Sequence, residues 1–380
     1  MAPERTPPAT GAPRAPSRPL YRVAIPTAAL VSFRLGGSDG VAVEAAKWSG
    51  ALGSLGFRIV TVAGSGPVDH VLPGLSIGAP APPSPREVEA ALAGCDLVVV
   101  ENLCSLPLNP AAAAVVAGVL RGRPALLHHH DLPWQRPQFA DAPPPPDDPR
   151  WTHVTINELS RRQLAERGIT ATTVYNAFDT DAAGGPPSGA VDAAAVAAVA
   201  ARDRLRRAVG VEDGARLVLQ PTRAIPRKNV AGGIAVAEQL GATFWLLGPA
   251  EDGYGDELAH LVARARVPVV LGWPDRTPRP VAEAYDACDV VTLPSTWEGF
   301  GNPSVEAALH RRPLAIGPYP VAGELAAFGF RWFGLDRIDR LERFLGDPDP
   351  GLHDHNLDVA DRHLALRDLP ARVAQVLPGR

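Results

Sequence analysis

The feature of this sequence that most constrains its fold is an alternation between short apolar runs and helical patterns, which occurs twice along the chain. Such alternation is typical of parallel strands joined by crossover helices. It pauses around residues 180–213 and then restarts, which predicts two doubly wound, Rossmann-like α/β domains in tandem, with the C-terminal ends of their strands facing a central cleft. The expected strands are 29–33, 57–63, 96–100, 124–129, 152–156 and 172–176 in the first half, and 216–220, 243–247, 268–271, 289–293 and 313–317 in the second.

The composition of the connecting segments indicates where these domains begin and end. Residues 1–19 are rich in proline and charged, without an apolar stretch, so they predict a disordered tail and not a signal peptide. The 380 residues are sufficient for two domains of ordinary size. We expect a first domain over 20–180, a linker over 181–213, a second domain over 214–350 and a C-terminal helical segment over 351–380 that could return to the first domain.

Charge and cysteine content exclude several classes of function. The formal net charge of −4 does not indicate nucleic-acid binding. The three cysteines are scattered and form no CxxC pair, so no disulfide framework is expected and a reducing cytoplasm fits best. The longest apolar run, residues 110–120, is shorter than the roughly 20 residues that span a bilayer. We therefore predict a cytoplasmic protein whose membrane contact, at the inner face, is at most peripheral.

The segment PSTWEGFGNPSVEAA, residues 294–308, carries the clearest chemical signal. It follows an expected strand, and its glycines Gly299 and Gly301 permit tight turns whose backbone amides stay accessible. Asn302 is a favourable N-cap and Pro303 suits the first helical position, so a helix is predicted to begin at Pro303. Free amides at a helix N-terminus bind anions, so this loop predicts a phosphate site.

Two carboxylates, Glu298 and Glu306, flank this anion site and admit three interpretations. They could bind a metal, but no DxD motif accompanies them. They could form the acid pair of a glycosidase, but the phosphate site would then have no purpose. They could accept hydrogen bonds from the hydroxyls of a ligand that also carries phosphate, such as a nucleotide-diphosphate sugar. In the segment TRAIPRKN, Arg223 and Lys228 follow another expected strand and could neutralise the diphosphate.

These segments resemble motifs of the retaining GT-B glycosyltransferases of family 4. EGFGNPSVE is similar to the E-x7-E motif of that family, and TRAIPRKN is similar to its R-x4-K diphosphate motif. RLGGSDGV, LLHHHDLPW and VYNAFD are similar to further family motifs, in the same order along the chain. The resemblance covers about residues 29–325 and implies the GT-B fold, with an N-terminal acceptor domain, a C-terminal nucleotide-sugar domain and hexosyltransferase activity.

The resemblance also implies roles for individual residues. One carboxylate would contact the donor sugar and the other the ribose, while two cations would stabilise the leaving diphosphate and a histidine would lie near the reacting sugar. The catalytic residues would be Glu298, Arg223, Lys228 and His130, and the neighbours His128 and His129 leave the register of the histidine open. The donor-binding residues would be Gly36, Gly37, Gly299, Phe300, Gly301, Asn302 and Glu306. No metal or other cofactor is implied; the co-substrate is a UDP- or GDP-sugar, and the acceptor is an unidentified small molecule, glycan or lipid.

Some features leave other functions open. His128 and His130 share one face of a strand and could indicate a metal site, but no further ligand at a suitable spacing is evident, so a metal is not expected. The segment GSGPVD, residues 64–69, lacks the third glycine of a dinucleotide-binding loop. The alternatives to a transferase are a GT-B nucleotide-sugar epimerase, a sugar phosphorylase and a protein that only binds a sugar nucleotide. A phosphorylase would usually need a pyridoxal-phosphate lysine, and Lys228 is the last lysine in the chain.

Overall fold

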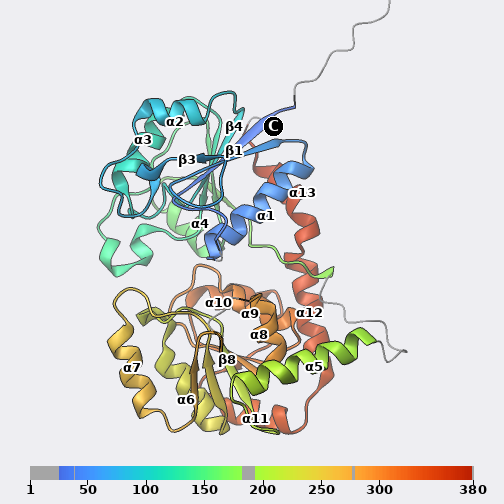
Figure 1. Cartoon of the computed structure of the whole chain (residues 1–380). Coiled ribbons are helices and arrows are strands. Elements are labelled where there is room, and N and C mark those ends of the chain that lie inside the picture. Colours follow the sequence, from blue (N-terminus) through green and yellow to red (C-terminus); the bar gives the residue numbers. More distant parts are fainter. Residues whose placement is uncertain (1–24, 38, 182–192, 276–278, 379–380) are drawn as a thin grey trace, which may run out of the picture.

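A computed structural model describes residues 25–37, 39–181, 193–275 and 279–378. The predicted N-terminal tail, residues 1–19, and residues 182–192 of the predicted linker lie outside the described residues. Figure 1 shows two α/β units, one above the other, with the first half of the chain in the upper unit and most of the second half in the lower unit.

The first half of the chain forms a seven-stranded sheet in which all neighbouring strands are parallel. Its strands are β1 (Thr27–Ser32), β2 (Arg58–Ala63), β3 (His70–Val71), β4 (Leu97–Glu101), β5 (Ala125–His129), β6 (Trp151–Thr155) and β7 (Ala171–Thr173). Their order in the sheet is β3-β2-β1-β4-β5-β6-β7. The helices between them are α1 (Gly40–Ser54), α2 (Pro85–Ala91), α3 (Pro110–Leu120) and α4 (Glu158–Ala165).

The second half forms a six-stranded sheet that is also parallel throughout. Its strands are β8 (Leu217–Gln220), β9 (Thr243–Leu246), β10 (Val269–Leu271), β11 (Val290–Leu293), β12 (Leu314–Ile316) and β13 (Phe333–Gly334). The helices of this half are α5 (Ala193–Ala208), α6 (Val230–Leu240), α7 (Gly255–Arg264), α8 (Val281–Ala287), α9 (Asn302–Leu309), α10 (Pro320–Ala327), α11 (Ile338–Gly346), α12 (Pro350–Leu364) and α13 (Leu369–Val376).

The two sheets share one topology. The order β3-β2-β1-β4-β5-β6 in the first sheet recurs as β10-β9-β8-β11-β12-β13 in the second, and this is the strand order of the Rossmann fold. The order reverses between β1 and β4 in one sheet and between β8 and β11 in the other. Ligands of such sheets bind outside the C-terminal ends of the strands at this reversal. The prediction of two Rossmann-like α/β domains is confirmed, and the loops after these four strands are where the site is expected.

Strand β1 illustrates why the first sheet is covered on both faces. Ala29 and Val31 belong to a hydrophobic cluster with residues of α2 and α3, whereas Ala28 and Leu30 belong to a cluster with residues of α1 and α13. Successive side chains of a strand face opposite sides of the sheet, so a strand buried on both faces appears in the sequence as a continuous apolar run. This is the pattern that predicted the parallel sheet.

The C-terminal helices connect the two units. Helix α12 packs against α9 in the second unit, while α13 lies against α1 in the first (Figure 1). Just before α13, Ala365 forms a parallel bridge with Phe178, and the Phe178 amide donates a hydrogen bond of 2.8 Å to the carbonyl of Leu364. Two segments far apart in the sequence therefore lie side by side where the chain passes between the units.

The structure corrects several local predictions. Helix α9 begins at Asn302 and its N-cap is Gly301, so Asn302 is not the cap. The reason is that the Asn302 side chain accepts a hydrogen bond of 2.9 Å from the side-chain amide of Asn176 instead. The strand expected over 172–176 ends at Thr173, because the chain after it turns toward the second unit. The two-residue edge strands β3 and β13 were not predicted, since such short segments carry no recognisable period.

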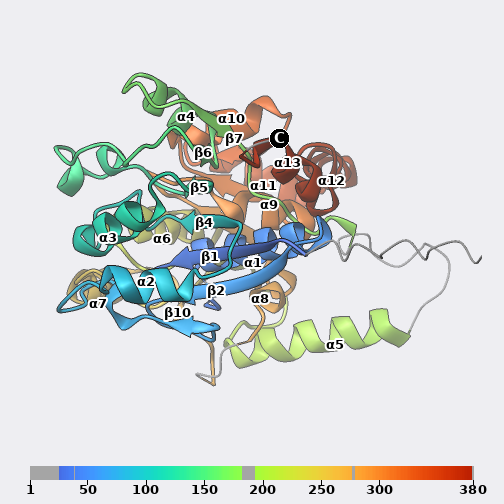
Figure 2. The same cartoon turned by 90° about the horizontal axis from the view of Figure 1, so that it is seen from above.

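Helix α5 occupies the described part of the predicted linker. It packs against α8, and its side chains Arg202 and Arg206 both bind Asp289, each at 2.9 Å. Figure 2 shows α5 running along the outer edge of the molecule. Among all the helices within the described residues, none is both long enough and apolar enough to cross a bilayer.

Candidate active site

The loop between β11 and α9 lies at the strand reversal of the second sheet. We call residues 297–301 the glycine loop. Within the described part of the chain, no group accepts a hydrogen bond from the amides of Gly299, Phe300 or Gly301, and these amides stand at the N-terminus of α9. Gly301 has a φ of 96°, and a Cβ there would lie 2.1 Å from the Tyr319 hydroxyl oxygen, so only glycine fits. The predicted free amides before a helix are present, and their binding of an anion stays a prediction.

The side chain of Phe300 anchors the glycine loop. It is buried, and its ring stacks on that of Phe178 with centroids 6.0 Å apart. Phe178 belongs to the segment that leaves the first unit, so the aromatic pair holds the loop against that unit. The ring of Phe300 is therefore used in packing, while its backbone amide makes no hydrogen bond within the described part of the chain.

Glu298 and Lys228 form a buried ion pair. The Lys228 Nζ lies 2.5 Å from Glu298 Oε1, and Arg227 Nη1 lies 3.2 Å from Oε2. Burial acts to raise the pKa of Glu298, but the charges of Lys228 and Arg227 outweigh it, so that this pKa lies below its usual value. The carboxylate is therefore ionised and its charge is balanced by the cations of the TRAIPRKN segment. Two negative side chains beside an anion site are tolerated in part because one of them has these partners.

Arg227 was not among the predicted site residues, although it stands next to Lys228 in the sequence. It donates hydrogen bonds to Glu298 and to the Trp297 carbonyl, at 3.2 Å and 2.9 Å. Arg223, which was predicted, lies farther out: its guanidinium is more than a third exposed and pairs with Glu251 at 2.5 Å. Both cation positions follow β8, the strand next to β11, so the fold brings the two motifs together as expected.

Glu306 lies in the second turn of α9, on the same helix that the glycine loop begins. Its Oε2 accepts a hydrogen bond of 2.5 Å from the Tyr285 hydroxyl, and burial raises its pKa. Tyr285, on α8, is a partner that the sequence did not indicate. It leaves the other oxygen of Glu306 available to accept hydrogen bonds.

In the first unit, Gly36 and Gly37 follow β1 at the strand reversal. Gly36 has a φ of 74°, and a Cβ there would meet the ring of Pro67 at 2.5 Å. The GSGPVD segment is therefore a packing partner of this turn. Asp39 caps the following helix by accepting a hydrogen bond from the Ala42 amide at 3.2 Å. The turn is positioned as predicted, and the roles of its glycines in ligand binding stay predictions.

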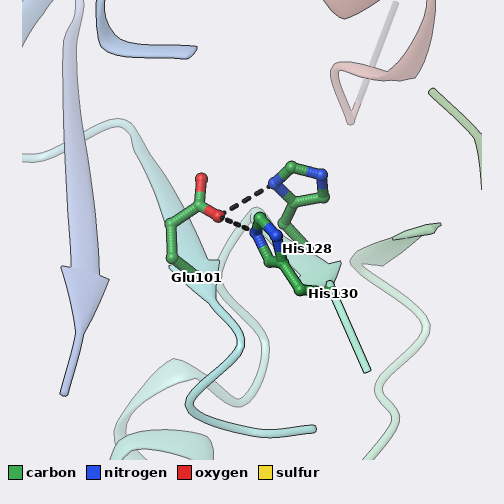
Figure 3. Close-up of side chains that lie close together, drawn as sticks. All are labelled: Glu101, His128 and His130. Carbon is green, nitrogen blue, oxygen red and sulfur yellow. Dashed lines mark hydrogen bonds and ion pairs between the residues drawn. The ribbon is translucent and has the colours of Figure 1, made fainter. Parts of the chain in front are cut away.

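Three buried side chains gather at the ends of β4 and β5 (Figure 3). Oε2 of Glu101 lies 2.9 Å from Nδ1 of His128 and 2.9 Å from Nε2 of His130. Glu101 is the register partner of His128 on the neighbouring strand. Burial alone would raise the pKa of Glu101, but the two histidines outweigh it and lower this pKa to about 2.

The arrangement corrects one expectation about this cluster. His128 and His130 were expected to have no further ligand nearby, yet Glu101 supplies one, and the three ligand atoms lie within 4.8 Å of one another. Two imidazoles and a carboxylate are ligands that zinc accepts. Glu101 could not be recognised as a partner from the sequence, because it is 27 residues from His128. The available signal was an acidic residue at the end of an apolar strand.

His129 faces the opposite side of β5. Its Nδ1 lies 2.6 Å from the Ser105 hydroxyl and its Nε2 lies 2.9 Å from Nδ1 of His153. This separation follows from the alternation of side chains along a strand. His128 and His130 therefore share a face that His129 does not.

A buried ion pair on α1, also missed from the sequence, stands beside the cluster. Glu44 is fully buried and pairs with Lys47, whose Nζ lies 4.5 Å from the centroid of the Phe178 ring. Oε2 of Glu44 has no hydrogen-bond partner among the described residues. Burial raises the pKa of Glu44, against the opposing charge of Lys47.

Direct contacts join the glycine loop to the first unit. A Cβ at Gly299 would lie 2.5 Å from the carbonyl oxygen of His130, so the two backbones touch. The Gly299 carbonyl accepts a hydrogen bond of 2.6 Å from the side chain of Asn157. On α10, Glu324 accepts hydrogen bonds from the amides of Glu158 and Leu159 at 2.8 Å and 2.7 Å, which caps α4 from the other unit. The loops after β5 and β11 are thus in direct contact.

Comparison with known sequences identifies related enzymes. The chain is similar to a mannosylglucosylglycerate synthase of Thermotoga maritima, with 26% identity over 92% of this chain and 99% of the relative. It is also similar to a mannosylglucosylglycerate synthase of Petrotoga mobilis, with 24% identity over 83% of this chain and 87% of that protein. No family model matches the sequence.

Comparison with solved structures identifies the fold. The chain superposes on Anabaena HepE in complex with UDP and glucose with a TM-score of 0.70, at 19% identity, over 92% of this chain and 99% of HepE. It superposes on WaaG, a glycosyltransferase involved in lipopolysaccharide biosynthesis, with a TM-score of 0.58, at 13% identity, over 93% of this chain and all of WaaG. These proteins share two Rossmann-like domains around a central site, so the chain has the GT-B fold.

Proposed function

We propose that this chain, a glycosyltransferase by its fold and its relatives, moves a sugar from a nucleotide-diphosphate sugar to an acceptor with retention of anomeric configuration, as family 4 enzymes do. The observation that carries the proposal is the contact between the halves. The glycine loop, with three free amides, lies against the backbone of His130, and the Lys228–Glu298 pair flanks it. The glycine loop comes from one domain and His130 from the other, and the two meet. This arrangement suits a donor bound in one domain and an acceptor bound in the other.

The donor is held chiefly by the second domain. The amides of the glycine loop bind the diphosphate or the sugar, and the positive end of α9 adds to their attraction for phosphate. Glu306 accepts hydrogen bonds from the ribose through the oxygen that Tyr285 leaves free. Glu298 accepts from the sugar hydroxyls, since an ionised carboxylate has room for about four donors and two cations occupy only part of this capacity. Gly36 and Gly37 approach the ligand from the first domain.

The negative charge that develops on the diphosphate as its bond to the sugar breaks is stabilised by the second domain's cations. Lys228 donates one hydrogen bond to Glu298 and has two more to give, while Arg223 is exposed toward the outer part of the site. Fixed cations and amides that need no reorganisation are the usual source of such stabilisation. Because these groups supply the positive charge, we propose that transfer requires no metal ion. A metal chelator should leave the rate unchanged.

The donor and acceptor follow from the relatives as first candidates. HepE binds UDP-glucose, which supports a UDP-sugar, and the similarity to mannosylglucosylglycerate synthases supports a mannosyl donor with a small, acidic glycoside as acceptor. A GDP-sugar is the candidate for the mannosyl donor. A glycan or lipid acceptor would be reached from the same site by peripheral contact with the inner face of the membrane. We place the protein in the cytoplasm, where nucleotide sugars are available.

A two-stage experiment tests the proposal. Thermal shift with a panel of UDP- and GDP-sugars should reveal one that raises the melting temperature, since a ligand stabilises by RT ln(1 + [L]/Kd). That donor is then incubated with an acceptor panel led by glucosylglycerate, and the anomeric configuration of the product is read by NMR. An inverted product would exclude retention. Donor consumed without acceptor would identify an epimerase, and donor binding without any turnover would identify a binding protein.

A further inference from the structure

We infer that Glu101 is a positioning residue of this active site: one carboxylate oxygen accepts a hydrogen bond from each of His128 and His130, and so fixes the tautomer and direction of the His130 ring. This inference rests on the proposed transfer function, because it gives His130 its place beside the donor sugar. Glu101 itself does not touch the substrate. It lies at the end of β4, completely buried, and binds the His130 ring, whereas the glycine loop touches the His130 carbonyl.

The hydrogen bonds determine where the protons are. An ionised carboxylate can only accept, so both nitrogens that face Oε2, Nδ1 of His128 and Nε2 of His130, must carry hydrogen. A neutral His130 then has its lone pair on Nδ1, and no described residue makes a hydrogen bond to that atom. Fixing one ring nitrogen by a hydrogen bond decides the state of the other. His130 thus presents an acceptor that can take a hydrogen bond from a ligand hydroxyl.

Packing fixes the planes of the two rings. Trp48 of α1 lies against His128 with ring centroids 4.3 Å apart, and His128 lies against His130 at 4.4 Å. The His130 backbone is held separately, since its amide donates a hydrogen bond of 3.1 Å to the Asn102 side chain. With the backbone held and the ring packed against His128, the hydrogen bond from Nε2 to Glu101 is what keeps the His130 ring from turning about its side-chain torsions.

The decisive variant is Glu101→Gln, whose amide cannot accept from both imidazoles through an ionised oxygen. We expect kcat to fall about tenfold to hundredfold, which corresponds to the loss of a charge-assisted hydrogen bond. The affinity for nucleoside diphosphate should stay within about twofold of wild type, because this ligand binds the second domain. Glu101→Asp, which keeps an ionised acceptor, should recover part of the lost kcat.

The matched control is His129→Asn, which alters an equally buried histidine of the same strand that faces away from the cluster. It should lower the melting temperature without changing which ring nitrogen of His130 carries the proton. If Glu101→Gln resembled this control, with stability reduced and the proton of His130 on the same nitrogen as in wild type, Glu101 would be structural only and the inference would be overturned. One equivalent of zinc in the purified wild-type protein that is lost in Glu101→Gln would also overturn it, because the cluster would then be a metal site.

A second readout does not depend on turnover. Long-range 1H–15N NMR spectra of the wild-type protein assign the proton of His130 directly, and we expect the Nε2–H form, with loss of this preference in Glu101→Gln. Observation of the Nδ1–H form in wild type would refute the inference even if transfer is demonstrated. Conversely, the expected tautomer in a protein that transfers no sugar would leave the positioning by Glu101 intact and remove the proposed function.

Discussion

Two buried carboxylates, one in each half of the molecule, have partners of different kinds. Glu298, in the loop after β11, is paired with the cations Lys228 and Arg227. Glu101, at the end of β4, is bound by the imidazoles of His128 and His130. Both lie at the strand reversal of a Rossmann-like sheet. The difference is instructive, because the Glu298 carboxylate is balanced by an ammonium and a guanidinium, whereas the Glu101 carboxylate is held by two imidazoles, and burial lowers the pKa of His128.

The largest effect is expected from breaking the pair in the second half. Lys228→Met leaves a buried Glu298 with Arg227 alone, and removing one partner of a buried ion pair lowers the free energy of unfolding by about 3–5 kcal/mol. Binding of nucleoside diphosphate should also weaken, since the proposed donor site uses the same ammonium to bind the phosphates. Urea denaturation and calorimetric titration measure the two effects. Lys228→Arg, which keeps the charge, is the control. Equal stability of Lys228→Met and wild type would show that the pair does not contribute to the free energy of unfolding.

The two acids of the E-x7-E motif should differ in what they bind. Glu306→Gln is expected to weaken nucleoside diphosphate binding by about tenfold to hundredfold, because a charge-assisted hydrogen bond to ribose is worth about 1.5–3 kcal/mol. Glu298→Gln should leave this affinity nearly unchanged and reduce the rate of transfer by a similar factor. Calorimetric titration of both variants, with their melting temperatures, tests the assignment. Equal affinities for nucleoside diphosphate would contradict it.

The contact between the halves can be tested at one glycine. Gly299→Ala would place a Cβ 2.5 Å from the His130 carbonyl oxygen, which forces the glycine loop away from the first domain. Overpacking of this kind costs about 1–3 kcal/mol, so kcat should fall by about tenfold to hundredfold. Gly323→Ala is the matched control, because a Cβ there meets nothing within 4 Å inside α10; it should be neutral or slightly stabilising. Unchanged transfer by Gly299→Ala would mean that the two domains do not close as observed.

The smallest effect is expected from the titrating half. The pKa of His128 lies below its ordinary value because burial disfavours the imidazolium. The unfolded chain therefore binds more protons than the folded one as the pH falls from 7 to 5, and stability decreases over that range. Asparagine donates a hydrogen bond to Glu101 without titrating, so His128→Asn should lose less stability than wild type between these pH values. Urea denaturation at pH 7 and pH 5 measures the difference; parallel losses would show that His128 does not contribute.

Much of the fold was determined by local patterns. The apolar runs around Val99, Leu219 and Val291 are short enough to read directly as strands, because a parallel strand is buried on both faces and needs no partner to be recognised. The glycine loop and the Lys228 segment could also be recognised from the sequence, since the amides, the helix end and the cations that would bind an anion lie in short, continuous segments. These predictions needed only the chemistry of a dozen consecutive residues.

The remainder depended on residues brought together from far apart. Glu101 meets His130 across 29 positions, Asn157 meets Gly299 across 142, and Glu324 caps a helix 166 residues away. Even the start of α9 depends on a distant residue. The side chain of Asn302, which was expected to cap the helix, accepts a hydrogen bond from the side-chain amide of Asn176 in the first domain instead. The sequence by itself determined most of the strands and helices and the glycine loop, since these depend on interactions within a few residues. The partners of each buried charge were decided only by the tertiary structure, because a desolvated polar group must pair with whichever side chain the packing of the two sheets places beside it.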